Sequence, residues 1–405
     1  MIKKEIIKAY VLKNALEHNG KANQGSIINS LFNHGLKKQD IPKIIPEIQQ
    51  IINQVNKLNK EQQEKEFEKL ENIITYRKER QGLPELPNLK KGKVITRFSP
   101  SPSGPLHIGH LLAILPNFLY AEKYKGKFYI RIEDTNPENI YKPAYNMIKK
   151  EANWLCKNKV KFIIQSERLD IYYKYAEKLI NKKAAYVCTC SQEQFKEFVS
   201  KKQNCPCRNL LSDKQLERWG KMLSKTKNSF QPGEAVLRFK SGMQQKNPAM
   251  RDFPLARINT TSHPLQKNKY KVWPLMNLSV TVDDIELKIT HIIRGKDHKD
   301  NAKRQEMMYK VLGKQKSYPY TAFIGRLHFK DLKLSATQMR KDVESGKYKS
   351  WDDPKLPTIA SLKKQGYKPE AFYEYATQRG ISETDKTITS KDFYEVINNF
   401  NKKIK

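Results

Sequence analysis

Residues 99–110 read SPSPSGPLHIGH, and this stretch indicates how the middle of the chain folds. The residues before it, 94–98, are mostly β-branched or aromatic and are typical of a strand. The residues after it, 107–125, are apolar at helical spacing, and Gly126 marks the expected end of that helix. The quoted stretch is therefore predicted to be a strand-to-helix turn, whose free backbone N–H groups and helix dipole would suit a phosphate.

Two histidines close this stretch at a spacing of three residues. His107 and His110 would lie on one face of the first helical turn, because residues three apart are neighbours on a helix surface. Gly109 would leave that face open, so that a flat group could approach the backbone. The alternative is a structural turn that carries two surface histidines.

The composition narrows the class of partner. The chain has 405 residues, with 77 Lys and Arg against 42 Asp and Glu and a net charge of +35. That charge favours nucleic acid over a membrane as the partner, since no run approaches the ~20 apolar residues of a membrane span. The alternative origin for part of the net charge is biased coding. The N-terminus lacks a signal peptide's apolar core. Five cysteines do not make a disulfide framework in so long a chain, so we expect a cytoplasmic protein.

Strands and helices alternate through the main body of the chain, which predicts parallel βαβ units. We expect strands at residues 93–98, 127–134, 160–167 and 286–298. Residues 1 to about 80 show only helical periodicity and end at a linker containing Pro and Gly, residues 81–93. Residues 184 to about 270 are irregular and indicate an insertion, and helices are expected after Ser335.

Charged residues stand at the ends of three predicted strands. Arg97 ends the first, Glu133 and Asp134 end the second, and Arg294 ends a later one. Open α/β sheets bind ligands at the carboxyl ends of their strands, and arginine has a planar fork that matches a carboxylate. Together these residues could hold a zwitterion with an additional acid group. The alternative for each is a solvated charge at the rim of the sheet.

Four of the five cysteines form two close pairs within the insertion. They are Cys188, Cys190, Cys205 and Cys207. Thiolates grouped in this way suit tetrahedral zinc, which can stabilise a small insertion that lacks a core of its own. The alternative is four unliganded thiols, because C-x-C spacing is less diagnostic than C-x₂-C. The fifth, Cys156, is expected to be a small buried residue.

A basic segment follows the last predicted strand. The sequence FKDLKLSATQMRKDV places Lys330, Lys333, Arg340 and Lys341 around a Ser-Ala-Thr turn. Such a loop could clamp a triphosphate while charge moves to its leaving end. In so basic a chain, a charged solvent loop is the alternative.

Several motifs in order resemble those of one family. RFSPSPSGPLHIGH is similar to the HIGH motif of class I aminoacyl-tRNA synthetases, and RIEDTNPE, QSERLDIYYKYAEKLI, VDD, ITHIIRGKDH and WDDPKLPT resemble an archaeal-type glutamyl-tRNA synthetase. The resemblance covers nearly the whole chain. It implies an α/β fold with a Rossmann-type catalytic domain. The implied parts are a helical domain at 1–88, catalytic halves at 89–185 and 273–335, an insertion for the tRNA acceptor end at 186–272, and a helical stem-contact domain at 336–405.

The resemblance also implies roles for individual residues in a glutamate–tRNA ligase. It implies ATP binding by Gly104, His107, Gly109, His110 and Lys333. It implies glutamate binding by Arg97, Ser101, Glu133, Met276 and Arg294. His107, His110, Lys333 and Arg340 would carry the catalytic charges, and Arg294 would pair with the glutamate side chain. Mg²⁺ would accompany ATP, and the four cysteines would hold structural Zn²⁺.

Two residues depart from the family pattern at these sites. The second lysine of the KMSKS-like loop falls on Ala336 or Gln338. Losing such a cation could cost several kcal/mol unless Lys333, Arg340 or Lys341 substitutes for it. Met276 stands where the family has a pocket tyrosine, so a hydroxyl is lost beside a polar substrate.

The expected partners are L-glutamate and tRNA, namely tRNA-Glu with tRNA-Gln as a second candidate. The chain stops at Lys405, where β-barrel anticodon-binding domains are expected, and this favours a separate C-terminal anticodon-binding subunit. Its docking surface would be an apolar patch around Phe372, Tyr375 and Phe393, unless these residues are core. The alternative function is a tRNA-binding paralogue that is non-catalytic or acts in tRNA modification.

Overall fold

The computed structural model describes residues 2–74, 82–89 and 94–404. The chain divides into two compact units, residues 1–79 and residues 80–405. The predicted linker, 81–93, lies partly outside the described residues. Among the helices that are described, none is long and apolar enough to cross a membrane.

The first unit is helical. Its main helices are α1 (Lys4–Glu17), α2 (Gln24–Leu31), α3 (Ile41–Val55) and α4 (Lys60–Glu68). Ile48 and Val55 of α3 are fully buried and Ile51 is nearly so, because their spacing brings them onto one face of the helix. This face packs against apolar residues of α1, including Ile7 and Leu12.

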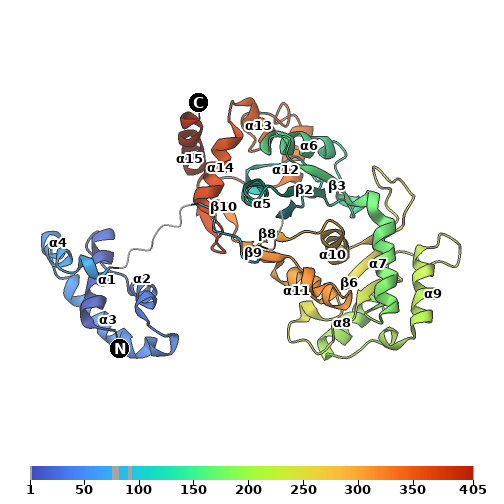
Figure 1. Ribbon diagram of the computed structural model, residues 1–405, viewed down its shortest axis with the longest axis horizontal. Helices are drawn as coiled ribbons and strands as arrows, with labels where there is room; N and C mark the ends of the chain where they lie inside the picture. Colours follow the sequence, from blue (N-terminus) through green and yellow to red (C-terminus); the bar gives the residue numbers. More distant parts are fainter. Residues whose placement is uncertain (1, 75–81, 90–93, 405) are drawn as a thin grey trace. The chain divides into compact units, whose positions relative to one another are not determined.

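The second unit is built on parallel strands, as the alternating pattern predicted. Strands β1 (Ile95–Phe98), β2 (Lys127–Ile132) and β3 (Lys161–Ile164) form a parallel sheet in the order β1-β2-β3. Helix α5 (Leu111–Lys123) connects β1 to β2, and α6 (Ala144–Leu155) connects β2 to β3 (Figure 1). The carboxyl ends of these strands therefore meet at one edge of the sheet.

A second parallel pair continues this layer. Strand β8 (His291–Gly295) pairs with β9 (Tyr320–Ile324), and Thr290 N–H donates to the Ile95 carbonyl at 2.9 Å, beside β1. Farther along, the buried Asn117 side chain of α5 joins β8: its Nδ2 donates to the Ile293 carbonyl at 2.8 Å, and its Oδ1 accepts from the Ile293 N–H at 3.1 Å. A side-chain amide thus satisfies the backbone of β8.

Gly126 is required by packing. Helix α5 already ends at Lys123, and the left-handed residue is Lys125, with φ 51°. A Cβ at Gly126 would lie 1.7 Å from the carbonyl oxygen of Val94. Glycine is therefore needed where the chain re-enters the sheet.

The segment between β3 and β8 contains an antiparallel sheet. Helix α7 (Leu169–Asn181) leads into four strands in the order β4-β5-β6-β7. They are β4 (Ala185–Cys188), β5 (Val236–Phe239), β6 (Pro254–Ile258) and β7 (Val272–Pro274). Helices α8 (Gln192–Lys201) and α9 (Ser212–Leu223) lie between β4 and β5 in the chain, and α10 (Met276–Glu286) and α11 (Lys299–Val311) flank β8.

The C-terminal part is mainly helical. Its elements are β10 (Leu327–Phe329), α12 (Ala336–Glu344), α13 (Ile359–Lys364), α14 (Pro369–Arg379), β11 (Lys386–Ile388) and α15 (Ser390–Lys403). The apolar patch expected around Phe372, Tyr375 and Phe393 is wrong, since these side chains are only 0%, 8% and 1% exposed. They belong to the same core as the parallel sheet, where Tyr375 and Phe393 pack edge to face at 5.2 Å.

Candidate active site

A pocket of about 290 Å³ opens at the carboxyl ends of β1, β2 and β8. It is lined by residues from the strand ends, from α10 and from α11. The five residues predicted to bind glutamate all line it: Arg97, Ser101, Glu133, Met276 and Arg294. The sheet topology brings Arg97, Glu133 and Arg294 together because the strands end at the same edge, whereas Ser101 lies in the turn after β1 and Met276 comes from α10. Met276, the first residue of α10, is 38% exposed.

Arg97 is fixed by a buried carboxylate that the sequence prediction did not assign to the site. Its Nε and Nη2 donate to the two oxygens of Asp284 at 2.9 and 3.0 Å, and Arg131 Nη1 donates to Asp284 Oδ1 at 2.7 Å. Burial alone would raise the pKa of Asp284, but Arg97 and Arg131 outweigh it and lower that pKa below its ordinary value. Asp284 is therefore an ionised bridge between two arginines.

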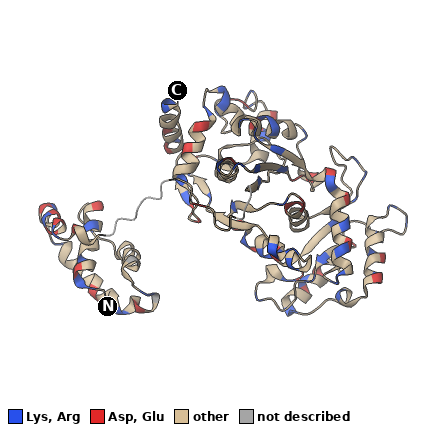
Figure 2. Cartoon of the chain, in the orientation of Figure 1, with Lys and Arg blue, Asp and Glu red and all other residues tan. Residues whose placement is uncertain are grey.

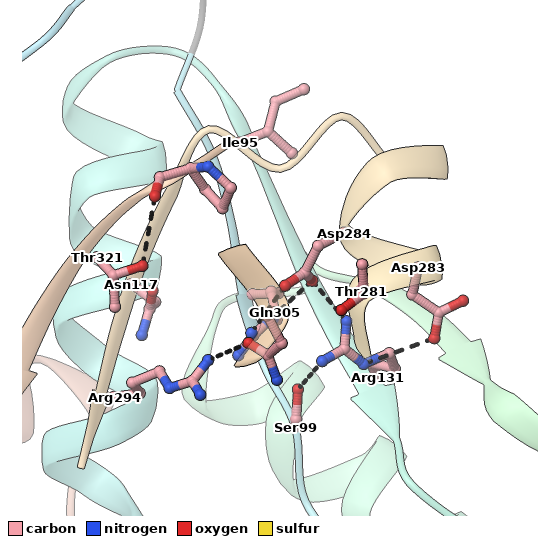
Figure 3. Close-up of polar contacts among 12 residues, drawn as sticks. Ile95, Ser99, Asn117, Arg131, Thr281, Asp283, Asp284, Arg294, Gln305 and Thr321 are labelled. Carbon is pink, nitrogen blue, oxygen red and sulfur yellow. Dashed lines mark hydrogen bonds and ion pairs between the residues drawn. The ribbon is translucent and has the colours of Figure 1, made fainter. Parts of the chain in front are cut away.

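Arg131 connects this bridge to the rest of the pocket (Figure 3). Its side chain is fully buried, and its Nη2 donates to Ser99 Oγ at 2.9 Å and to Glu133 Oε1 at 3.1 Å. The neighbouring Asp283 accepts from Arg168 Nε at 2.8 Å. Two signals for this network were present in the sequence: an arginine inside an apolar strand, and two adjacent carboxylates in the apolar stretch of α10.

Arg294 lies across the pocket and differs from Arg97 in its partners. Its Nη1 donates to Gln305 Oε1 at 2.9 Å and its Nη2 donates to the His298 carbonyl at 3.2 Å, and both acceptors are neutral. Burial, with the nearby charge of Arg97, lowers the pKa of Arg294 to about 10, so it stays protonated at neutral pH. Among the described residues, no carboxylate forms an ion pair with it. The pocket therefore has one buried positive charge without a protein counter-ion.

The two histidines share one face of the turn, as predicted. Their rings stack with centroids 3.8 Å apart. His107 Nδ1 accepts from the Gly109 N–H at 3.1 Å, and His110 Nδ1 accepts from the His107 N–H at 3.2 Å. A ring nitrogen that accepts cannot carry a proton, so both rings are neutral and present Nε2–H. Burial lowers the pKa of His107 to about 4, and burial with its neighbour lowers that of His110 well below the ordinary value.

The prediction of free backbone N–H groups is wrong for residues 106–109, the part of the turn that carries the histidine motif. Leu106 N–H donates to the buried Glu151 carboxyl at 2.6 Å, and Ile108 N–H donates to the Pro357 carbonyl at 3.0 Å. The N–H groups of His107 and Gly109 are used by the histidine rings, as described above. Ile359 N–H also donates to the Leu106 carbonyl at 3.0 Å. At residues 106–109, the donors left for a phosphate are therefore the imidazole Nε2–H groups of the histidines.

The basic segment 330–341 lies against the same turn. A Cβ placed on Gly109 would be 2.8 Å from Leu334 Cδ1, and one placed on Gly104 would be 2.9 Å from Ala336 Cβ. Both glycines are therefore close-approach positions for this segment. Lys333, beside Leu334, is exposed.

Arg340 lies farther along, on α12. Its guanidinium lies over the Tyr141 ring at 5.6 Å, and its Nε is 3.8 Å from Glu344. Gln338, one of the two positions for the missing lysine, donates from Nε2 to Asp342 at 3.0 Å.

The four cysteines of the insertion come together at the end of β4. Their Sγ atoms all lie within 4.8 Å of one another. Cys188 and Cys205 are 3.8 Å apart, and Cys190 and Cys207 are 3.9 Å apart. A tetrahedral Zn²⁺ site with Zn–S bonds of about 2.3 Å has S–S separations of about 3.8 Å. The donor set therefore fits zinc in number, chemistry and spacing.

Positive charge is spread over the second unit. Figure 2 shows Lys and Arg along many of its helices, including α7 and α11, with fewer Asp and Glu among them. This distribution suits contact with a polyanion through many phosphates.

Comparisons with known proteins point to one family. The family model for the catalytic domain of class I tRNA synthetases (E and Q) matches residues 93–403. The glutamate–tRNA ligase of Methanothermobacter marburgensis is 40% identical over 397 residues, which is 97% of this chain and 70% of that protein. The glutamate–tRNA ligase of Thermococcus kodakarensis is 40% identical over 95% of this chain and 68% of its own length. A crystal structure of a glutamate tRNA ligase from Elizabethkingia meningosepticum has a TM-score of 0.53 at 22% identity, covering 76% of this chain and 69% of that one, and supports the fold.

Proposed function

This chain belongs to the class I tRNA synthetases for glutamate and glutamine, and from that premise we infer that it is a glutamate–tRNA ligase. The reaction uses ATP to activate glutamate as glutamyl-adenylate and then transfers the glutamyl group to the 3′ end of tRNA. One observation in the pocket carries the choice of glutamate. Arg294 is buried and protonated without a protein carboxylate, so a substrate with an acidic side chain supplies the missing counter-ion.

The remaining pocket residues suit the other end of the amino acid. Arg97 has Nη1 left over from its pair with Asp284, and Ser101 and Glu133 line the same cavity. The Glu133 carboxylate is a counter-ion for the substrate ammonium group, and Arg97 Nη1 and the Ser101 hydroxyl are donors to its α-carboxylate. These contacts direct that carboxylate towards the nucleotide, with the side chain held at Arg294.

Activation then needs positioning and charge stabilisation. An oxygen of the α-carboxylate attacks the α-phosphorus of ATP, the bond to pyrophosphate breaks, and the developing charge is met by donors from His107 and His110. A hydroxyl of the terminal ribose of tRNA then attacks the acyl carbon, and AMP leaves. No step forms a covalent bond to the enzyme, so catalysis is positioning and electrostatics.

The turn and the basic segment form the proposed ATP site. Gly104 and Gly109 allow the segment that carries Leu334 and Ala336 to pack closely on the turn, and Lys333 of that segment supplies a cation. Arg340 is our candidate for the missing second lysine, since it lies one helical turn beyond Ala336 and Thr337 on α12. Mg²⁺ would enter with ATP, because it is commonly held by substrate phosphates and a few carboxylates or waters.

We also propose that the four cysteines hold a structural Zn²⁺. The metal would tie the end of β4 to the segment around Cys205 and Cys207, where the apolar cluster is small. The antiparallel sheet beside it is our candidate for contact with the tRNA acceptor end. A separate anticodon-binding subunit remains a prediction, and its contact surface is not the residues around Phe372, which are core.

Glutamate-dependent ATP–pyrophosphate exchange tests the proposed function. We expect exchange that requires glutamate and is stimulated by total tRNA, and Arg294→Gln should abolish it while the variant stays folded. The matched control is Arg326→Gln, which removes an arginine that is 60% exposed and lies outside the pocket. Binding of tRNA that depends steeply on salt concentration, without any exchange activity, would instead support the non-catalytic paralogue.

A further inference from the structure

Gln305 of α11 reaches the pocket and was not predicted as a site residue. It is 3% exposed, lines the cavity, and accepts from Arg294 Nη1 through Oε1 at 2.9 Å (Figure 3). An arginine only donates, so the oxygen of the Gln305 amide must face it and the Nε2 must point elsewhere. That Nε2 is buried and has no hydrogen-bond partner among the described residues.

Arg294 has a matching unused donor. Its Nε is also buried without a partner in the described part of the chain. Buried donors are nearly always paired in native proteins, so the unpaired Nε2 of a side chain that lines the cavity indicates a missing acceptor beside Gln305. A carboxylate bound in the cavity would supply an acceptor and also the counter-ion that Arg294 lacks.

The neutrality of Gln305 matters as much as its donors. Arg97 is held by the carboxylate of Asp284, and its charge is therefore already balanced inside the protein. Arg294 is held by an amide and a carbonyl, which orient the guanidinium without balancing its charge. A glutamate at position 305 would have nearly the same shape but would form the ion pair itself.

We propose that Gln305 is a specificity-determining residue for an acidic substrate side chain. It orients Arg294 through Oε1, leaves the charge of that arginine available to the substrate, and donates from Nε2 to the same substrate carboxylate. This inference rests on the proposed function, since it assigns the second donor of the glutamate subsite.

The variant Gln305→Glu tests this role with opposite effects on stability and binding. We expect its unfolding temperature without glutamate to be higher than that of the native chain, because Arg294 gains a buried partner. We expect its KM for glutamate in tRNA-dependent exchange to rise about 10- to 100-fold, with a smaller change in kcat, because the subsite is already neutralised. A purely structural glutamine would give no such combination.

Two further variants keep the test decisive. Gln315→Glu makes the same chemical change at an exposed position and should alter neither quantity. Gln305→Met keeps the length of the side chain but removes both polar atoms, so it should raise KM without raising the unfolding temperature. A native KM in a folded Gln305→Glu variant, or in Gln305→Met if the first does not fold, would overturn the inference. Absence of exchange in the native chain would instead overturn the proposed function.

Discussion

Replacing Asp284 by asparagine should destabilise the second unit by about 3 kcal/mol, near the lower end of the range for breaking a buried ion pair. The substitution keeps the shape of the side chain but removes the charge that Arg97 and Arg131 share. Arg97 then loses its only ion pair among the described residues. Arg131 keeps Glu133 at 3.1 Å, and for this reason we expect the lower end of the range.

Urea unfolding followed by tryptophan fluorescence measures this loss. All four tryptophans lie in the second unit, so their signal reports on the part of the chain that holds the network. The matched control is Glu286→Gln on the same helix, an exposed carboxylate that accepts from Tyr175 at 2.6 Å. We expect it to change the free energy of unfolding by less than about 0.5 kcal/mol.

The effect of pH provides an independent check. Arg97 and Arg131 lower the pKa of Asp284 despite its burial, so the unfolded state takes up a proton more readily than the native state. The contribution of Asp284 to the free energy of unfolding is complete above the ordinary carboxyl pKa of about 4. It is lost as the pH falls through the lower pKa of the native state. The difference in the free energy of unfolding between the native chain and the Asp284→Asn variant should therefore shrink in acid. A loss below about 1 kcal/mol at neutral pH would refute the assignment of an ionised bridge.

Two further predictions follow from the histidines and the cysteines. Because burial lowers the pKa of His107 to about 4, exchange activity should show no histidine step between about pH 6 and 8. The free energy of unfolding should fall as the pH drops from about 6.5 towards 4, because in this range only the unfolded histidine is protonated. A step near pH 6.5 would contradict neutral, buried rings. Metal analysis should find one zinc per chain, and both a chelator and Cys205→Ser should lower the unfolding temperature; a chain purified without metal and indifferent to chelator would contradict the zinc site.

The sequence was sufficient to predict those features that depend on local periodicity and on the order of strands. The parallel strands followed from short β-branched runs between helical patterns. The gathering of Arg97, Glu133 and Arg294 in one pocket followed from the geometry of parallel sheets, in which the carboxyl ends meet. The shared face of His107 and His110 followed from their spacing alone.

What could not be predicted depends on partners far away in the chain. Arg97 meets Asp284 across 187 positions, so no local pattern distinguishes it from an arginine free to bind substrate with its whole fork. The N–H of Ile108 donates to the carbonyl of Pro357, far away in the chain. The sequence alone could not show that this amide is unavailable to a phosphate. Gln305 was missed because a polar residue in an amphipathic helix gives no sign of its burial.

The contacts of Pro357 and Ile359 with the histidine turn also have a consequence for how the protein is made. Residues 106–108 are synthesised early, yet two of their hydrogen-bond partners, Pro357 and Ile359, lie about 250 residues later in the chain. A growing chain on the ribosome can form β1 and α5 long before it can close the turn between them. The proposed nucleotide site is therefore among the last features to be completed, and a chain that ends before Pro357 lacks the contacts that close this turn.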